Sequence, residues 1–118
     1  MSFPVVIHHN PDCGTSRNVL EITRAAGHDP VVIEYLQTGW TRPQLLALFA
    51  AANLTPRAAL RLNGTRAEAL GLPDASDETI LDAMVDDPIL VNRPLVACPN
   101  GVRLCRPSET VRELIDGL

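Results

Sequence analysis

Cys13 is the residue of this chain best placed to act as a nucleophile. It lies in residues 9–18, His-Asn-Pro-Asp-Cys-Gly-Thr-Ser-Arg-Asn, between a short apolar run and a helical pattern. The free amide groups and the positive dipole at the start of a helix stabilise an anion. A free cysteine is often a small buried apolar residue. Here its small and polar neighbours favour a thiolate nucleophile with a lowered pKa.

The spacing around Cys13 argues against two common kinds of cysteine site. Position 16 is serine, so the Cys-x-x-Cys pair of a dithiol centre is absent. The Cys-x5-Arg loop of cysteine phosphatases is also absent, because Val19 stands where the arginine would be. Cys13 would therefore need an outside thiol, or a distant cysteine, to resolve an adduct. Asp12 would raise the pKa of Cys13 if its carboxylate faced the sulfur.

A histidine and three arginines are further candidates for the site. His9 could hold a positive charge near Cys13 or relay a proton, or it could simply pack at a strand end. Arg61 and Arg93 stand within apolar runs, and Arg106 follows a predicted strand with Glu109 nearby. A charge in such surroundings must find an anion or reach water. Each arginine therefore either makes a structural ion pair or binds an anionic ligand.

The elements that would position these residues follow from apolar periodicity and turn residues. Strand 3–8, helix 14–26 and strand 31–35 form a βαβ unit with parallel strands. A hairpin follows later, with strands 95–97 and 102–105 around the turn 99–101. Pro94 stands at the entry to this hairpin, where a cis peptide bond is a candidate.

Helices are predicted between these two parts and at the end of the chain. Capping boxes at 41–44 and 65–68 start two helices, the second ending near Gly71, and Ser76 is the N-cap of a third. A last helix begins at residue 107 or 108. The sum is a single α/β domain over 1–118: a βαβ–ββα mixed sheet with a helical insertion at roughly 38–90.

Composition narrows the class of protein. The chain has 118 residues, 46% of them apolar, and a formal net charge of −4, which disfavours nucleic-acid binding. All ten basic residues are arginine. Three cysteines do not suit a disulfide-stapled secreted domain, and neither a signal peptide nor a membrane segment is visible. We expect a cytoplasmic protein without a membrane partner and, from the spacing of histidines and cysteines, without a metal site.

Three motifs together resemble the glutaredoxin-coupled arsenate reductase family. They are residues 9–18, Asn92-Arg93-Pro94, and Arg103 to Glu109, and they occur in the family's order and spacing. The resemblance runs from the first strand to the last helix. It implies a thioredoxin-like fold with a helical insertion, in agreement with the predicted order of elements.

The resemblance also implies an activity, arsenate reduction in arsenical resistance. The Cys13 thiolate would attack arsenate, glutathione would form a mixed adduct, and glutaredoxin would supply the reducing thiol before arsenite leaves. Glutathione is then a co-substrate, and no cofactor stays bound.

The resemblance assigns roles to individual residues as well. His9 and Ser16 would assist Cys13, and Pro94 would be the cis-proline of the fold. The arsenate oxygens would be held by three arginines and by backbone at the helix start, namely Arg61, Arg93, Arg106, Gly14 and Thr15.

The sequence leaves two other functions as alternatives. A monothiol glutathione-dependent oxidoreductase would act on mixed disulfides and ignore arsenate. A redox-linked transcription regulator of the same fold usually carries Cys-x-x-Cys, which Ser16 breaks. Of the remaining thiols, Cys98 is predicted to pack in the core, whereas Cys105 fits the core and the site about equally well.

Overall fold

The computed structural model describes residues 4–118, so Phe3, where the first strand was predicted to begin, lies outside the described residues. The contacts within it define two compact units. One unit is the chain up to Tyr35 together with Arg93–Leu118, and the other is Leu36–Asn92. The predicted insertion at 38–90 corresponds to this second unit.

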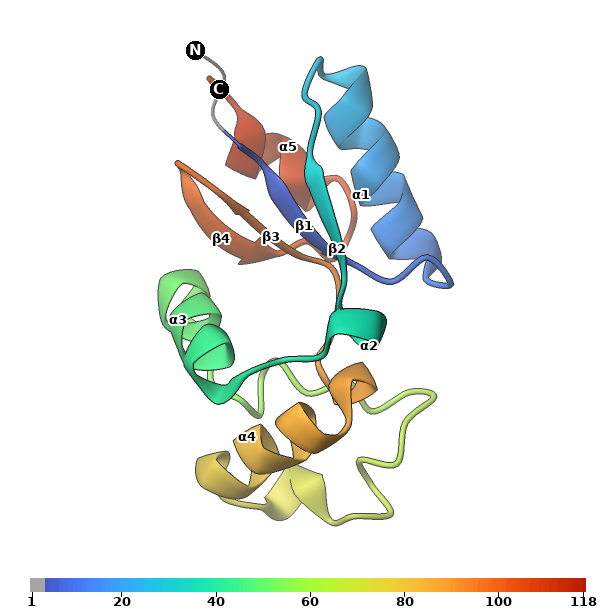
Figure 1. Cartoon of the computed structure of the whole chain (residues 1–118), viewed down its shortest axis with the longest axis vertical. Coiled ribbons are helices and arrows are strands. Elements are labelled where there is room, and N and C mark those ends of the chain that lie inside the picture. Colours follow the sequence, from blue (N-terminus) through green and yellow to red (C-terminus); the bar gives the residue numbers. More distant parts are fainter. Residues whose placement is uncertain (1–3) are drawn as a thin grey trace. The chain divides into compact units, whose positions relative to one another are not determined.

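The first unit is built on a four-stranded sheet with the order β2-β1-β3-β4 (Figure 1). Its strands are β1 (Val6–His9), β2 (Val31–Glu34), β3 (Leu95–Cys98) and β4 (Gly101–Leu104). β1 and β2 are parallel, as the strand–helix–strand order predicts, and β3 is antiparallel to both β1 and β4. The mixed α/β class is thereby confirmed, with strand ends within one or two residues of those predicted for β2, β3 and β4.

Two helices of the first unit pack around one apolar core with the sheet. These are α1 (Gly14–Ala25) and α5 (Thr110–Ile115) (Figure 1). Ile7 of β1, Val96 of β3, Val19 of α1 and Leu114 of α5 belong to this core. The last helix begins later than predicted, because residues 107–110 first form a turn in which the Thr110 N–H donates to the Pro107 carbonyl.

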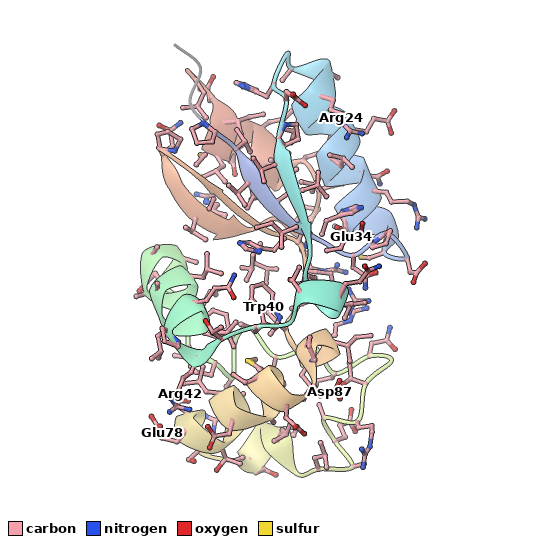
Figure 2. All side chains as sticks on the ribbon, viewed as in Figure 1. Arg24, Glu34, Trp40, Arg42, Glu78 and Asp87 are labelled. Carbon is pink, nitrogen blue, oxygen red and sulfur yellow. The ribbon has the colours of Figure 1, made fainter. Side chains whose placement is uncertain are left out.

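The second unit is mainly helical. Its elements, with the short α2 beginning one residue before the unit, are α2 (Tyr35–Thr38), α3 (Arg42–Ala52), η1 (Leu72–Asp74), α4 (Asp77–Asp86) and η2 (Pro88–Leu90). The predicted caps of α3 and α4 are confirmed: Thr41 and Gln44 form a capping box, and Ser76 accepts from the Thr79 N–H. Arg42 forms ion pairs with Glu78 and Asp82 of α4 (Figure 2).

The prediction of a helix after the second capping box, at 65–68, is wrong. Residues 65–71 form bends and turns, and the Thr65 hydroxyl donates to the Arg61 carbonyl and accepts from the Ala67 N–H at 3.2 Å. Gly71 adopts a left-handed conformation with φ 68°, and Pro73 follows in the short 3-10 helix. Gly71 and Pro73 limit the length of any helix that starts at this capping box. The first turn of an α-helix is unfavourable and is offset only when further turns follow, so no α-helix forms here.

Within residues 4–118, no helix combines the length and apolar composition needed to cross a bilayer. The same residues contain no group of three or more His, Cys, Asp and Glu side chains suited to a metal ion.

Candidate active site

Cys13 is the N-cap residue of α1, with φ −99° and ψ 120°. Its carbonyl accepts the first helical hydrogen bond, from the Arg17 N–H at 3.0 Å, and its own N–H donates to the Asn10 carbonyl at 3.0 Å. The Asn10 side chain accepts from the Asp12 N–H, which makes an Asx turn. The chain thus turns between the end of β1 and the start of α1, and it leaves Cys13 only 8% exposed.

Three groups stabilise the Cys13 sulfur as a thiolate. Burial by itself raises the pKa of Cys13, but hydrogen bonds from the Ser16 backbone N–H and from the Arg93 and Arg106 side chains lower it, and the Arg93 charge adds to this. The net result is a pKa lowered from 9.0 to about 7. About half of the thiol is therefore ionised at neutral pH.

Arg93 and Arg106 meet at one end of the β3–β4 hairpin. Arg93 precedes β3 and Arg106 follows β4, and the register Leu95↔Leu104 places both arginines at the same end of the ladder. The Arg106 Nη1 atom donates to the Arg93 carbonyl at 3.0 Å and lies 3.8 Å from Cys13 Sγ. The sequence offered Glu109 as a local partner for Arg106, but the Arg106 Nη1 atom contacts the Arg93 carbonyl and Cys13 instead. Two guanidinium groups around one sulfur form a site that suits an oxyanion.

The Arg93–Pro94 peptide bond is cis. The Pro94 carbonyl accepts from the Cys105 N–H at 3.0 Å and so extends the hairpin toward the site.

His9 contacts the site through Ser16. The His9 Nδ1 atom and the Ser16 hydroxyl lie 2.7 Å apart, and the same hydroxyl accepts from the Asn10 N–H at 3.1 Å. Burial is the main cause that lowers the pKa of His9; the Glu34 charge opposes it, whereas the charges of Arg17 and Arg24 add to it. His9 is therefore neutral at pH 7, which favours a hydrogen-bonding role over a positive charge beside Cys13.

The structure does not test the predicted anion-binding roles of Gly14, Thr15 and Arg61. Gly14 and Thr15 are the first residues of α1, where backbone N–H groups have no acceptor within the helix. Arg61 belongs to the second unit, where its Nε donates to the Asn63 carbonyl and its N–H to the Leu90 carbonyl.

Asp12 does not prevent the ionisation of Cys13. Asp12 is exposed. The causes that shift the Cys13 pKa are burial and the contacts with Ser16, Arg93 and Arg106.

The other two thiols differ from Cys13. Cys105 is fully buried in the core of the first unit, and burial raises its pKa to about 12. Cys98 is half-buried and packs against the same core, with its Sγ 3.7 Å from the Leu114 carbonyl.

Asn10 is a site residue that the sequence reasoning missed. Its backbone and side chain make three of the hydrogen bonds that shape the turn before Cys13. The Asn-Pro dipeptide, a common start of turns, was the available indication.

Comparisons with known proteins assign this chain to one family. The model of the ArsC family matches residues 8–114. Arsenate reductase ArsI2 of Synechocystis is 63% identical over 114 residues, which cover 95% of this chain and 81% of that protein. The arsenate reductase of Escherichia coli K12 is 48% identical over 94% of this chain and 80% of its own length.

A solved structure of an arsenate reductase has the same fold as this chain. The arsenate reductase from Vibrio cholerae superposes with a TM-score of 0.92 and 36% identity, over 98% of this chain and all of that one. This match confirms the predicted thioredoxin-like fold. The family match covers nearly the whole chain, so this protein belongs to the ArsC family.

Proposed function

We propose that this protein reduces arsenate to arsenite at Cys13. The observation that carries the proposal is that the Cys13 thiol has a pKa of about 7 and accepts hydrogen bonds from the Arg93 and Arg106 side chains. Relatives named arsenate reductase, 46–63% identical over most of the chain, support the choice of substrate.

In the first step the Cys13 thiolate attacks arsenic. A sulfur–arsenic bond forms, and one arsenate oxygen leaves as water after protonation. Thiolate and arsenate are both anions, so the attack meets electrostatic repulsion. The two guanidinium groups offset this repulsion and bind the oxygens with paired N–H groups.

Reduction of As(V) to As(III) takes two electrons, which two thiols supply when they join as a disulfide. One arsenate and two thiols then give one arsenite, one disulfide and one water. Cys105 is unsuited to supply such a thiol, because it is fully buried and its pKa is raised to about 12. Following what the resemblance to the glutaredoxin-coupled family implies, we propose glutathione and glutaredoxin as outside donors, with glutathione as co-substrate and no bound cofactor.

The remaining roles are proposals of the same kind. Ser16 would hold the sulfur with its backbone N–H, and His9 would hold the Ser16 hydroxyl. Arg61 and the N–H groups of Gly14 and Thr15 would add to the binding of arsenate.

The test is arsenate-dependent NADPH oxidation in the presence of glutathione, glutaredoxin and glutathione reductase. Wild type and the matched control Cys98→Ser should be active, and Cys13→Ser should show only background. Leaving out glutaredoxin tests its role as donor. The role of glutathione is tested by measuring arsenite directly with glutathione left out, because NADPH oxidation in this assay itself requires glutathione disulfide. An equal rate for Cys13→Ser would refute the proposal.

A second candidate function rests on the same ionised thiol, which also suits exchange with mixed disulfides. A glutathione-dependent oxidoreductase would reduce a glutathionylated peptide and show no arsenate-dependent rate. Measuring both substrates with one preparation separates the two functions.

A further inference from the structure

Arg17 is an exposed residue in the first turns of α1 whose side chain turns back toward the cysteine loop. Its Nη1 donates to the Pro11 carbonyl at 2.8 Å. Its backbone N–H donates to the Cys13 carbonyl at 3.0 Å. A Cβ atom added to Gly14 would lie 3.7 Å from Arg17 Nη2, so the guanidinium lies over the start of the helix. Arg17 therefore donates hydrogen bonds to the carbonyls of the two residues that flank Asp12, Pro11 and Cys13.

The bond from Arg17 adds to the hydrogen bonds that hold this turn. Asn10 accepts from Cys13 with its carbonyl and from Asp12 with its side chain, and its own N–H donates to Ser16. The Pro11 carbonyl is the acceptor that Arg17 uses. In the observed backbone conformation Cys13 reaches the Ser16 N–H and two arginines, so a looser turn would misplace the sulfur.

Charge alone does not account for the position of Arg17. Arg24 lies further along α1 (Figure 2), and both arginines line one cleft with His9 and lower its pKa. The cations that lower the pKa of Cys13 itself are Arg93 and Arg106. What distinguishes Arg17 from Arg24, among the hydrogen bonds of the described residues, is the contact with Pro11.

We propose that Arg17 is a positioning residue whose bond to the Pro11 carbonyl holds the turn 10–13 and thereby presents the Cys13 sulfur to Ser16, Arg93 and Arg106. The proposal rests on the proposed function only in taking Cys13 as the nucleophile.

The test compares three single variants with wild type. Arg17→Met keeps the length of the side chain but removes the donor and the charge, and Arg17→Lys keeps the charge and one donor group. Arg24→Met is the matched control, because it removes a charge from the same cleft without touching the loop. For each protein, alkylation of Cys13 by iodoacetamide is followed by peptide mass spectrometry from pH 5 to 10. Thermal unfolding verifies that each variant is folded.

Arg17→Met should raise the midpoint of the alkylation profile by about 0.5–1 pH unit. Loss of one hydrogen bond should also lower kcat for arsenate about fivefold, with a smaller change in KM. Arg17→Lys should fall between Arg17→Met and wild type, and Arg24→Met should match wild type within about twofold. Equal shifts in Arg17→Met and Arg24→Met, or none in either, would overturn the proposal.

Alkylation needs no arsenate, so the two proposals fail separately. A shifted alkylation midpoint in Arg17→Met, together with no arsenate reduction by wild type, would support the role of Arg17 and refute the reductase. Arsenate reduction by wild type with an unshifted Arg17→Met would do the reverse.

Discussion

The Nη1 atom of Arg106 lies 3.8 Å from the Sγ atom of Cys13, although 93 positions separate the two residues in the chain. The contact forms because β4 ends beside the start of β3, and β3 pairs with β1, whose end leads to Cys13. The guanidinium is fixed by a second hydrogen bond, to the Arg93 carbonyl. A thiolate and its counter-ion are therefore held together by the sheet.

Replacing Arg106 should weaken the nucleophile. Arg106→Met removes one of the hydrogen bonds that lower the Cys13 pKa, so this pKa should rise from about 7 toward 9.0. A rise of about one unit would reduce the thiolate fraction at pH 7 about fivefold. The pH profile of Cys13 alkylation measures this directly. Arg103→Met is the control, since Arg103 points to Glu113 of α5 instead; an equal shift in both variants would contradict the assignment.

His9 and Ser16 should act as a coupled pair. Ser16→Ala leaves the buried Asn10 N–H and His9 Nδ1 without the hydroxyl that they share, which should cost about 1–3 kcal/mol of unfolding free energy. His9→Gln removes the other side of the same contact. In a double-mutant cycle, monitored by urea unfolding and by kcat, the double variant should lose less than the sum of the two single losses. Simple additivity would show that the 2.7 Å contact has little energetic weight.

His8 should make the protein sensitive to acid. Burial lowers its pKa from 6.5 to about 4. The unfolded chain binds the proton first as the pH falls, so stability is complete above pH 6.5 and is lost on the way down to pH 4. The loss should reach about 3 kcal/mol. Urea unfolding at several pH values should therefore give a flatter profile for His8→Gln than for wild type or for the control His28→Gln, which alters a less buried histidine.

Cys105 should be dispensable for activity. It is fully buried and its pKa is raised to about 12, so it can neither attack arsenate nor be alkylated readily at pH 8. Cys105→Ser should keep most of the arsenate-dependent rate, while the buried hydroxyl lowers the unfolding free energy by about 1–3 kcal/mol. A complete loss of rate in a variant that remains folded would assign Cys105 to the site.

Local patterns were sufficient for much of the fold. The apolar run before Cys13 and the capping residues Thr41 and Ser76 predicted elements that the structure contains, because strand alternation and helix caps depend on near neighbours. The same reasoning failed at Thr65. There the hydroxyl bonds to Arg61 and Ala67, and Gly71 and Pro73 prevent the helix that the four-residue pattern predicts.

The sequence by itself determined that a cysteine would stand at the start of a helix without a second cysteine in reach of its motif. It also limited the candidate anion-binding groups to a few arginines. Only the tertiary structure decided that Arg93 and Arg106 meet Cys13, that His9 contacts Ser16, and that Cys105 is part of the core. These outcomes depend on strand pairing and burial, which bring together groups far apart in the chain and set their pKa values.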